Sequence, residues 1–137
     1  MGLYYLDTSA AFKLLAAEEH AERFLEFYGA HRDDDWVSSD LLRIEVIRAV
    51  TRVRPALIPD AHRLLGAFDT VPMTEEVVRA AMLEPDPGLR SLDAIHLATV
   101  RLLGSEVTAL LTYDDRLAAA ARDAGIPVES PGRSAAT

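Results

Sequence analysis

Four acidic residues that lie far apart in the chain stand beside apolar stretches: Asp7, Glu45, Asp93 and Asp114. The segments around them read LYYLDTSA, LLRIEVIRAV, RSLDAIHLATV and ALLTYDD. A carboxylate among apolar residues is unfavourable to bury alone, because the ionised group loses its hydration there. Four of them, at the ends of elements that a parallel sheet would bring together, indicate a shared divalent cation. The pattern therefore predicts a metal-dependent enzyme.

Asp7 and Asp93 lie near the starts of predicted helices, where a carboxylate can also stabilise the helix as an N-cap or by interaction with the helix dipole. Asp7 follows the strand-length run Leu3–Leu6 and so lies at the carboxyl edge of the predicted sheet, where α/β proteins bind ligands. The alternative role for Asp7 is an Asx turn or a helix N-cap. Asp93 lies in the first turn of a helix, 92–103, that is apolar on nearly every side and therefore buried. Stabilisation of the helix dipole is the alternative there, but a buried carboxylate favours a functional role.

The other two acids carry their own alternatives. Glu45 lies in the middle of a helix, on the border of its apolar stripe, and an ion pair with Arg48 would be worth only about 0.2–0.5 kcal/mol. Asp114 and Asp115 both follow the strand predicted at 107–111. One of them caps the next helix, and the other can point across the strand ends. We favour Asp114 as the ligand and Asp115 as the helix cap.

Histidine does not add to this acidic set in the sequence. His96 stands one helical turn after Asp93, on the flank of a buried helix. A buried histidine with its hydrogen bonds satisfied by the core is a more common role there than a ligand or a base. We therefore interpret His96 as structural.

Composition sets the protein class. The chain has 137 residues, half of them hydrophobic, which predicts one domain over 1–129 and a small, polar, flexible tail over 130–137. A net charge of −8 argues against holding nucleic acid by overall charge, although a bound Mg²⁺ would reverse the local field. The absence of cysteine excludes disulfides, Cys-ligated zinc and thiol catalysis. Without a signal pattern or an apolar run of about 20 residues, we expect a cytoplasmic protein with no membrane segment.

The elements that must position the acids alternate along the chain. Strands are predicted at 3–6, 36–38, 70–72, 107–111 and 126–128, and helices at 10–16, 18–30, 40–53, 59–68, 75–83, 91–103 and 114–124. Thr8 or Ser9 is expected to cap the first helix, and Ser91 the helix that contains Asp93. The alternation predicts an α/β fold in three layers, with a parallel four- or five-stranded sheet flanked by helices.

At this point the residues resemble a known family. YLDTSA, the glutamate on an arginine-bearing helix, RSLDAIHLATV and LLTYDDRLAAAARDAGIPV are together similar to PIN-domain ribonucleases, and among them to VapC toxins of type II toxin–antitoxin pairs. The resemblance extends from Met1 to about Val128. It implies an α/β sandwich, cleavage of single-stranded RNA that depends on Mg²⁺ or Mn²⁺, inhibition by a small cognate VapB-like antitoxin, and a homodimer.

The resemblance also implies a set of site residues. The family places its metal-binding acids at the positions that are here Asp7, Glu45, Asp93 and Asp114. It often adds a small hydroxyl residue near the first acid and a polar residue before the last, which correspond to Thr8 or Ser9 and to Thr112. Family members frequently have one acid after the TY pair, whereas this chain has two, so the choice between Asp114 and Asp115 stays open.

An acidic site repels RNA, so nearby cations must contact the phosphates. Arg90, just before the Asp93 helix, is the first candidate for substrate binding. Further arginines, which have solvated positions on helix surfaces as their alternative, lie on or beside the Glu45 helix at positions 43, 48, 52 and 54.

Other enzyme classes fit less well. A HAD-type phosphatase needs a second aspartate two residues after the first, where this chain has Ser9. That class and receiver domains both need a lysine late in the chain, but Lys13 is the only lysine. The main alternative is a catalytically inactive PIN-like module that binds RNA or a protein, and the intact set of four acids argues against it.

Overall fold

The computed structural model describes residues 1–133 and contains a five-stranded parallel sheet. Its strands are β1 (Leu3–Leu6), β2 (Asp35–Ser39), β3 (Asp69–Val71), β4 (Ala109–Leu111) and β5 (Val128–Glu129). The spatial order is β3-β2-β1-β4-β5, so β1 lies at the centre and β3 and β5 form the edges. Tyr5 of β1 is in register with Val37 on one side and with Leu110 on the other.

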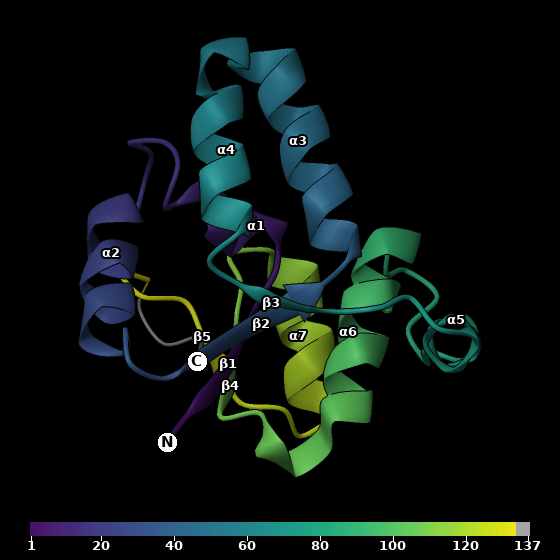
Figure 1. Cartoon of the computed structure of the whole chain (residues 1–137). Helices are drawn as coiled ribbons and strands as arrows, with labels where there is room; N and C mark the ends of the chain where they lie inside the picture. Colours follow the sequence, from purple (N-terminus) through teal and green to yellow (C-terminus); the bar gives the residue numbers. More distant parts are fainter. Residues whose placement is uncertain (134–137) are drawn as a thin grey trace.

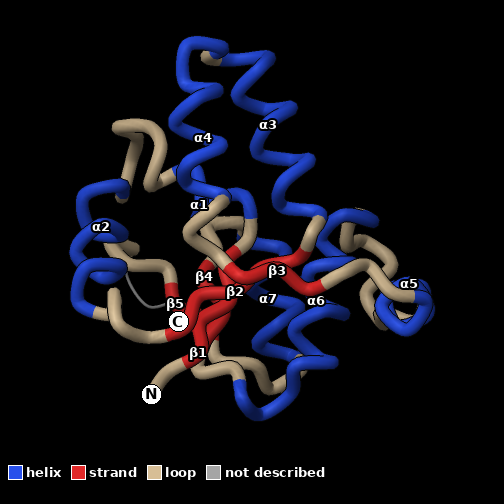
Figure 2. Tube along the Cα trace, viewed as in Figure 1, coloured by secondary structure: helices blue, strands red, loops and turns tan. Residues whose placement is uncertain are grey.

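Helices cover both faces of this sheet (Figure 1). They are α1 (Thr8–Phe12), α2 (Ala21–Ala30), α3 (Leu41–Val53), α4 (Ile58–Leu65), α5 (Glu75–Met82), α6 (Ser91–Leu103) and α7 (Asp115–Asp123), with short 3₁₀ turns at Pro55–Leu57 and Gly104–Glu106. In Figure 2 the paired helices α3 and α4 rise on one side of the red strands, and α6 and α7 lie on the other. The predicted three-layer α/β fold is confirmed.

The two faces have separate cores because side chains alternate along each strand. Tyr4 and Leu6 of β1 point to one face and pack with residues of α1 to α4, including Phe24 and Val46. Tyr5 points to the other face, into the core built with α6 and α7. Each face of the central strand is therefore buried, as expected for a parallel sheet covered on both sides.

The strand order reverses between β1 and β4. From β1 the chain adds β2 and β3 on one side of the sheet, and only later β4 and β5 on the other. In open α/β sheets, ligands bind outside the carboxyl ends of the strands at such a switch point. Asp7 directly follows β1, and Thr112 directly follows β4, so both stand at this position.

Three caps differ from those predicted. Asp7, rather than Thr8 or Ser9, caps α1, because its side chain accepts a hydrogen bond from the amide of Ala10. Helix α6 begins at Ser91 as predicted, but Arg90 occupies the cap position and makes no side-chain cap bond. Asp114, rather than Asp115, caps α7.

Residues after β5 contact the loop that follows β4. The Ser130 hydroxyl donates to the carbonyl of Thr112 (2.5 Å), and the Tyr113 hydroxyl donates to the carbonyl of Pro131 (2.6 Å). The predicted flexible tail, 130–137, thus begins with four residues that the structure describes, while 134–137 lie outside the described residues. In the described part of the chain, no helix is both long and apolar enough to cross a membrane.

Candidate active site

A pocket of about 250 Å³ lies at the carboxyl edge of the sheet, beside the switch point. It brings together seven of the predicted site residues: Asp7, Thr8, Ser9, Glu45, Arg90, Asp93 and Asp114. These come from the residue that follows β1, from α1, α3 and α6, and from the loops before α6 and α7, which are distant in the sequence. Thr112 does not line the pocket, but its hydroxyl contacts Asp7 at 2.6 Å.

Asp7 is held rigidly at the base of the pocket. Its Oδ1 accepts hydrogen bonds from the Ala10 amide (3.0 Å) and the Ser9 hydroxyl (2.7 Å), and its Oδ2 accepts one from Thr112. Burial raises the pKa of Asp7, although these hydrogen bonds favour the ionised form. The N-cap role that was the alternative for this residue is therefore combined with a position in the pocket.

Glu45 faces the pocket from the middle of α3. One of its oxygens, Oε1, accepts hydrogen bonds from the Thr8 hydroxyl (2.7 Å) and from Nε2 of His96 (2.8 Å). Burial alone would raise the pKa of Glu45, but these two contacts outweigh it and lower the pKa. Among residues 1–133, Glu45 makes no ion pair with Arg48, so the purely structural alternative for Glu45 does not hold.

Asp93 projects from the first turn of α6 and makes no side-chain hydrogen bond within the described residues. Burial and the nearby charges of Asp114 and Asp7 raise the pKa of Asp93 to about 6. Burial is the largest cause of this shift, and repulsion from the two neighbouring carboxylates adds to it.

The two adjacent aspartates after β4 point in different directions. Asp114 lines the pocket, and its Oδ1 also accepts a hydrogen bond from the amide of Leu117 (3.0 Å). Asp115 is exposed and forms an ion pair with Arg133 at 2.5 Å. Of the pair, Asp114 is the acid that can reach a ligand bound among the other carboxylates.

The hydroxyl groups near the site contact the protein itself. Ser9 donates to Asp7, accepts from the amide of Tyr113 (2.8 Å), and lies 3.4 Å from the Thr112 hydroxyl. Thr112 in turn accepts from the amide of Asp114 at 3.0 Å. These contacts orient the first acid and link the start of α1 to the loop before α7.

The donor set suits a hard divalent cation. Several carboxylate oxygens have no hydrogen-bond partner within residues 1–133: Oε2 of Glu45, Oδ2 of Asp114 and both oxygens of Asp93. Mg²⁺ and Mn²⁺ prefer such oxygen ligands, and a cation would relieve the repulsion among the acids. As they stand, no three His, Asp or Glu side chains of the described residues already enclose a metal position. The acids therefore line an open pocket rather than a closed cage.

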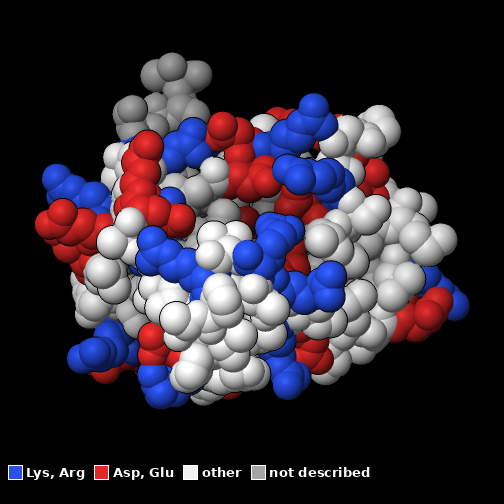
Figure 3. Space-filling model, turned by 90° about the horizontal axis from the view of Figure 1, so that it is seen from above, with Lys and Arg blue, Asp and Glu red and all other residues white. Residues whose placement is uncertain are grey.

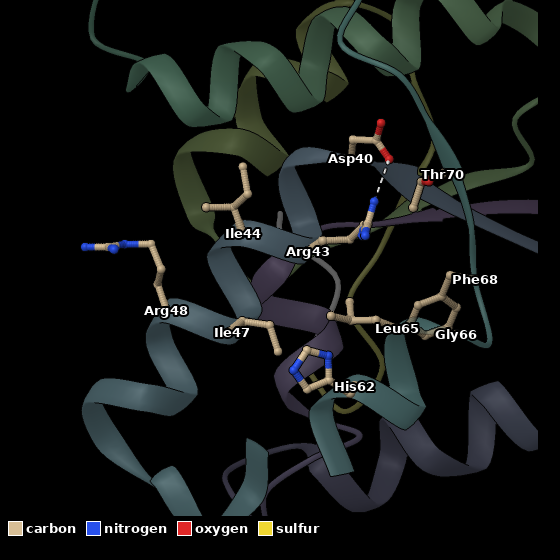
Figure 4. A pocket seen from close by; sticks show the side chains of 10 residues that line it. All are labelled: Asp40, Arg43, Ile44, Ile47, Arg48, His62, Leu65, Gly66, Phe68 and Thr70. Atoms are coloured by element: carbon tan, nitrogen blue, oxygen red, sulfur yellow. Dashed lines mark ion pairs between the residues drawn. The ribbon is translucent and has the colours of Figure 1, made fainter. Parts of the chain in front are cut away.

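A second hollow, larger at about 830 Å³, lies between α3, α4 and β3 (Figure 4). Ile44, Ile47 and Leu65 form its apolar part, and Arg43 lies 3.9 Å from Asp40 at its rim. Asp40 is the one acid in its lining, and it is already paired. We therefore place the chemistry in the smaller acidic pocket.

Comparison with known proteins identifies the family. A model of the PIN domain matches residues 4–123. This chain belongs to the PIN-domain family. The domain is 36% identical over 134 residues to Ribonuclease VapC35 of Mycobacterium tuberculosis, with 96% of this chain and 99% of that protein covered. It is 38% identical over 133 residues to Ribonuclease VapC47 of the same species, with 95% and 98% covered.

The fold of this PIN domain also matches solved structures. One is a toxin-antitoxin complex from Klebsiella pneumoniae, in which a chain aligns with a TM-score of 0.67 and 22% identity, covering 96% of this chain and 98% of that one. The solved structure supports the fold, and the family model and the two ribonuclease relatives confirm the resemblance to PIN-domain proteins of the VapC type.

Three residues that line the pocket, Ser91, Leu92 and His96, are not among the predicted site residues. His96 is buried with both ring nitrogens hydrogen-bonded, as the structural interpretation predicts, but one of its two partners is Glu45 of the pocket. A signal was present, because His96 follows Asp93 by three residues on one helix and so shares its face. The partner on α3 is 51 positions away in the sequence and could not be identified from helix spacing.

Proposed function

We propose that this PIN domain is a metal-dependent endoribonuclease of the VapC type, which hydrolyses phosphodiester bonds in RNA. The observation that carries the proposal is the convergence of Asp7, Glu45, Asp93 and Asp114 on one pocket. The near full-length similarity to proteins named as ribonucleases supports the same activity. The alternative of an inactive binding module is not favoured, because none of the four acids is missing or turned away.

The carboxylates would hold one or two Mg²⁺ or Mn²⁺ ions, which lower the pKa of a bound water and stabilise charge on the phosphate. The chain itself fixes the ligands before a cation binds. Asp7 is held by Ser9, Thr112 and the start of α1, and Glu45 is held by Thr8. Such preorganisation means that little reorganisation is needed at the moment of reaction.

Arg90 is the proposed phosphate contact. It lines the same pocket as the acids and stands at the start of α6, one turn before Asp93. Arg116 of α7 donates a hydrogen bond to the carbonyl of Gly88 and so restrains the loop that leads to Arg90. Figure 3 shows basic side chains beside acidic ones on the face seen from above. A local cation next to the acids lets an acidic protein bind an anionic polymer.

The proposed partner is a small cognate antitoxin similar to VapB. The Klebsiella pneumoniae structure with the same fold is a toxin-antitoxin complex, which supports this assignment. Exposed Leu25 of α2 and Ile44 of α3 offer apolar contacts on the helical face. A basic antitoxin side chain would reach the acidic pocket.

We further propose that the protein is a homodimer in the cytoplasm. Analytical ultracentrifugation at micromolar protein concentration tests the dimer, and a sedimentation coefficient that corresponds to a monomer would refute it.

The test is cleavage of a pool of structured RNAs in Mg²⁺, in Mn²⁺ and in EDTA. We expect metal-dependent cleavage by the native chain and none by Asp7→Asn or Asp93→Asn. Asp115→Asn is the matched control, because this neighbouring acid points to Arg133 instead of the pocket. Native protein that is folded and metal-loaded but cleaves no RNA in the pool would refute the nuclease assignment.

A further inference from the structure

His96 links the buried sheet to the acidic pocket. Its side chain is 1% exposed, and Nδ1 lies 2.7 Å from the hydroxyl oxygen of Tyr5, which is fully buried on β1. On its other side, Nε2 lies 2.8 Å from Oε1 of Glu45. Three polar groups thus form a continuous chain from the core to a carboxylate of the proposed active site.

The partners determine which ring nitrogen carries the proton. An ionised carboxylate can only accept hydrogen bonds, so Nε2 of His96 must be protonated to contact Glu45. The Tyr5 hydroxyl can donate to Nδ1, which leaves the proton of a neutral ring on Nε2. The buried tyrosine therefore selects the tautomer that Glu45 requires.

The contacts also determine which oxygen of Glu45 stays available. Thr8 and His96 both donate to Oε1, while Oε2 has no hydrogen-bond partner within residues 1–133. Two donors on one oxygen prevent the carboxylate from rotating freely and leave Oε2 for a ligand. The bond between His96 and Glu45 also ties α6, which carries Asp93, to α3.

We propose that His96 is a positioning residue that holds Oε1 of Glu45, so that Oε2 faces the divalent cation of the proposed ribonuclease site. This inference rests on the proposed function. The contact that satisfies the buried Nε2 also fixes the oxygen of Glu45 that Thr8 contacts. Groups that orient metal ligands in this way typically change metal affinity or activity by about 10–100-fold when they are removed.

The test compares three variants of the full chain. His96→Gln places an amide donor near the position of Nε2, whereas His96→Asn is too short to reach Glu45. His62→Asn is the matched control, because His62 is exposed on α4, away from the pocket. Binding of Mn²⁺, followed by electron paramagnetic resonance, should weaken about tenfold or more in His96→Asn. It should recover largely in His96→Gln and stay unchanged in His62→Asn.

A measurement on the unsubstituted protein guards against variants that fold poorly. Nitrogen-15 shifts of the His96 ring should report a protonated Nε2 and, in neutral imidazole, an Nδ1 without a proton. A bare Nε2, or native Mn²⁺ affinity in folded His96→Asn, would overturn the positioning role while leaving the ribonuclease assignment intact. If the native chain bound no Mn²⁺ and cleaved no RNA, the proposed function itself would fail, and the positioning role with it.

Discussion

Asp93→Asn should make the metal-free protein more stable while it abolishes RNA cleavage. The substitution keeps the size of the side chain and removes one negative charge from a pocket in which burial, Asp114 and Asp7 raise the pKa of Asp93 to about 6. In the absence of a cation, the ionised Asp93 side chain is therefore more favourable in the unfolded chain than in the folded one. An uncharged asparagine removes that penalty.

The magnitude follows from the shift in pKa. The ordinary value is 3.8 and the value in the folded protein is about 6. At about 1.36 kcal/mol per pKa unit, the full shift would correspond to about 3 kcal/mol. The carboxylate is partly exposed at the pocket, so solvent screening reduces the expected gain in the free energy of unfolding to about 1–2 kcal/mol. For a chain of this length, that raises Tm by about 3–8 °C.

The dependence on pH has a definite sign. Because the folded pKa is raised, the folded protein binds this proton more tightly than the unfolded chain does. The contribution of this bound proton to the free energy of unfolding is therefore present at low pH, and it is lost as the pH rises from about 4 through about 6. The free energy of unfolding of Asp93→Asn should therefore exceed that of the native chain by the largest amount at neutral pH. This difference should shrink as the pH falls towards about 4.

The assay is denaturant unfolding in EDTA at constant ionic strength, across this pH range, for both proteins. Asp115→Asn serves as the control for removal of one charge, and it should gain little because Asp115 is exposed and paired with Arg133. Equal stability of Asp93→Asn and the native chain at neutral pH would refute the repulsion argument. A gain that persisted unchanged at low pH would also refute it, because the protonated native side chain carries no charge to remove.

Three further predictions concern the cation, the helix cap and RNA. Adding Mg²⁺ at about 100 times its Kd should raise the free energy of unfolding of the native chain by about 2.7 kcal/mol, measured by calorimetry, and should do much less for Asp93→Asn. Asp114→Ala should lower the stability of the metal-free protein by about 1 kcal/mol, because α7 loses its N-cap; an unchanged denaturation midpoint would contradict this. Arg90→Gln should weaken RNA binding. It should also reduce the slope of the logarithm of the binding constant against the logarithm of the salt concentration by about 0.7–1, whereas Arg79→Gln on α5, outside the pocket, should change neither.

The fold was largely predictable because buried apolar residues follow the period of their element. Helix α6 lies at Ser91–Leu103, as the sequence predicted, and β1 occupies the predicted run. Helix starts were less predictable where several residues with capping side chains are adjacent. Asp7, Thr8 and Ser9 can all cap a helix. In the structure the Thr8 hydroxyl donates to Glu45 and the Ser9 hydroxyl donates to Asp7, and Asp7 is the residue that caps α1.

The site required contacts between distant parts of the chain. Asp114 and Asp115 are chemically identical neighbours, and only the structure shows that Asp114 caps α7 at the pocket while the exposed Asp115 pairs with Arg133. His96 acquires its partners from β1 and α3, 91 and 51 positions away. Residue type and helix spacing could identify the acids, but they could not predict which polar side chains would hold them.

The four acids differ in how the protein supports their charge. Asp7 and Asp114 each cap a helix, so backbone amides and the helix dipole stabilise the ionised side chain without a cation. Glu45 has two donors on one oxygen. Asp93 lies in the first turn of α6, but it accepts no hydrogen bond within the described residues, and burial and the neighbouring acids still raise its pKa to about 6. Removing charge from Asp93 should therefore stabilise the empty protein, whereas removing the Asp114 carboxyl should destabilise it, and opposite signs at two acids of one pocket are not expected from general charge repulsion alone.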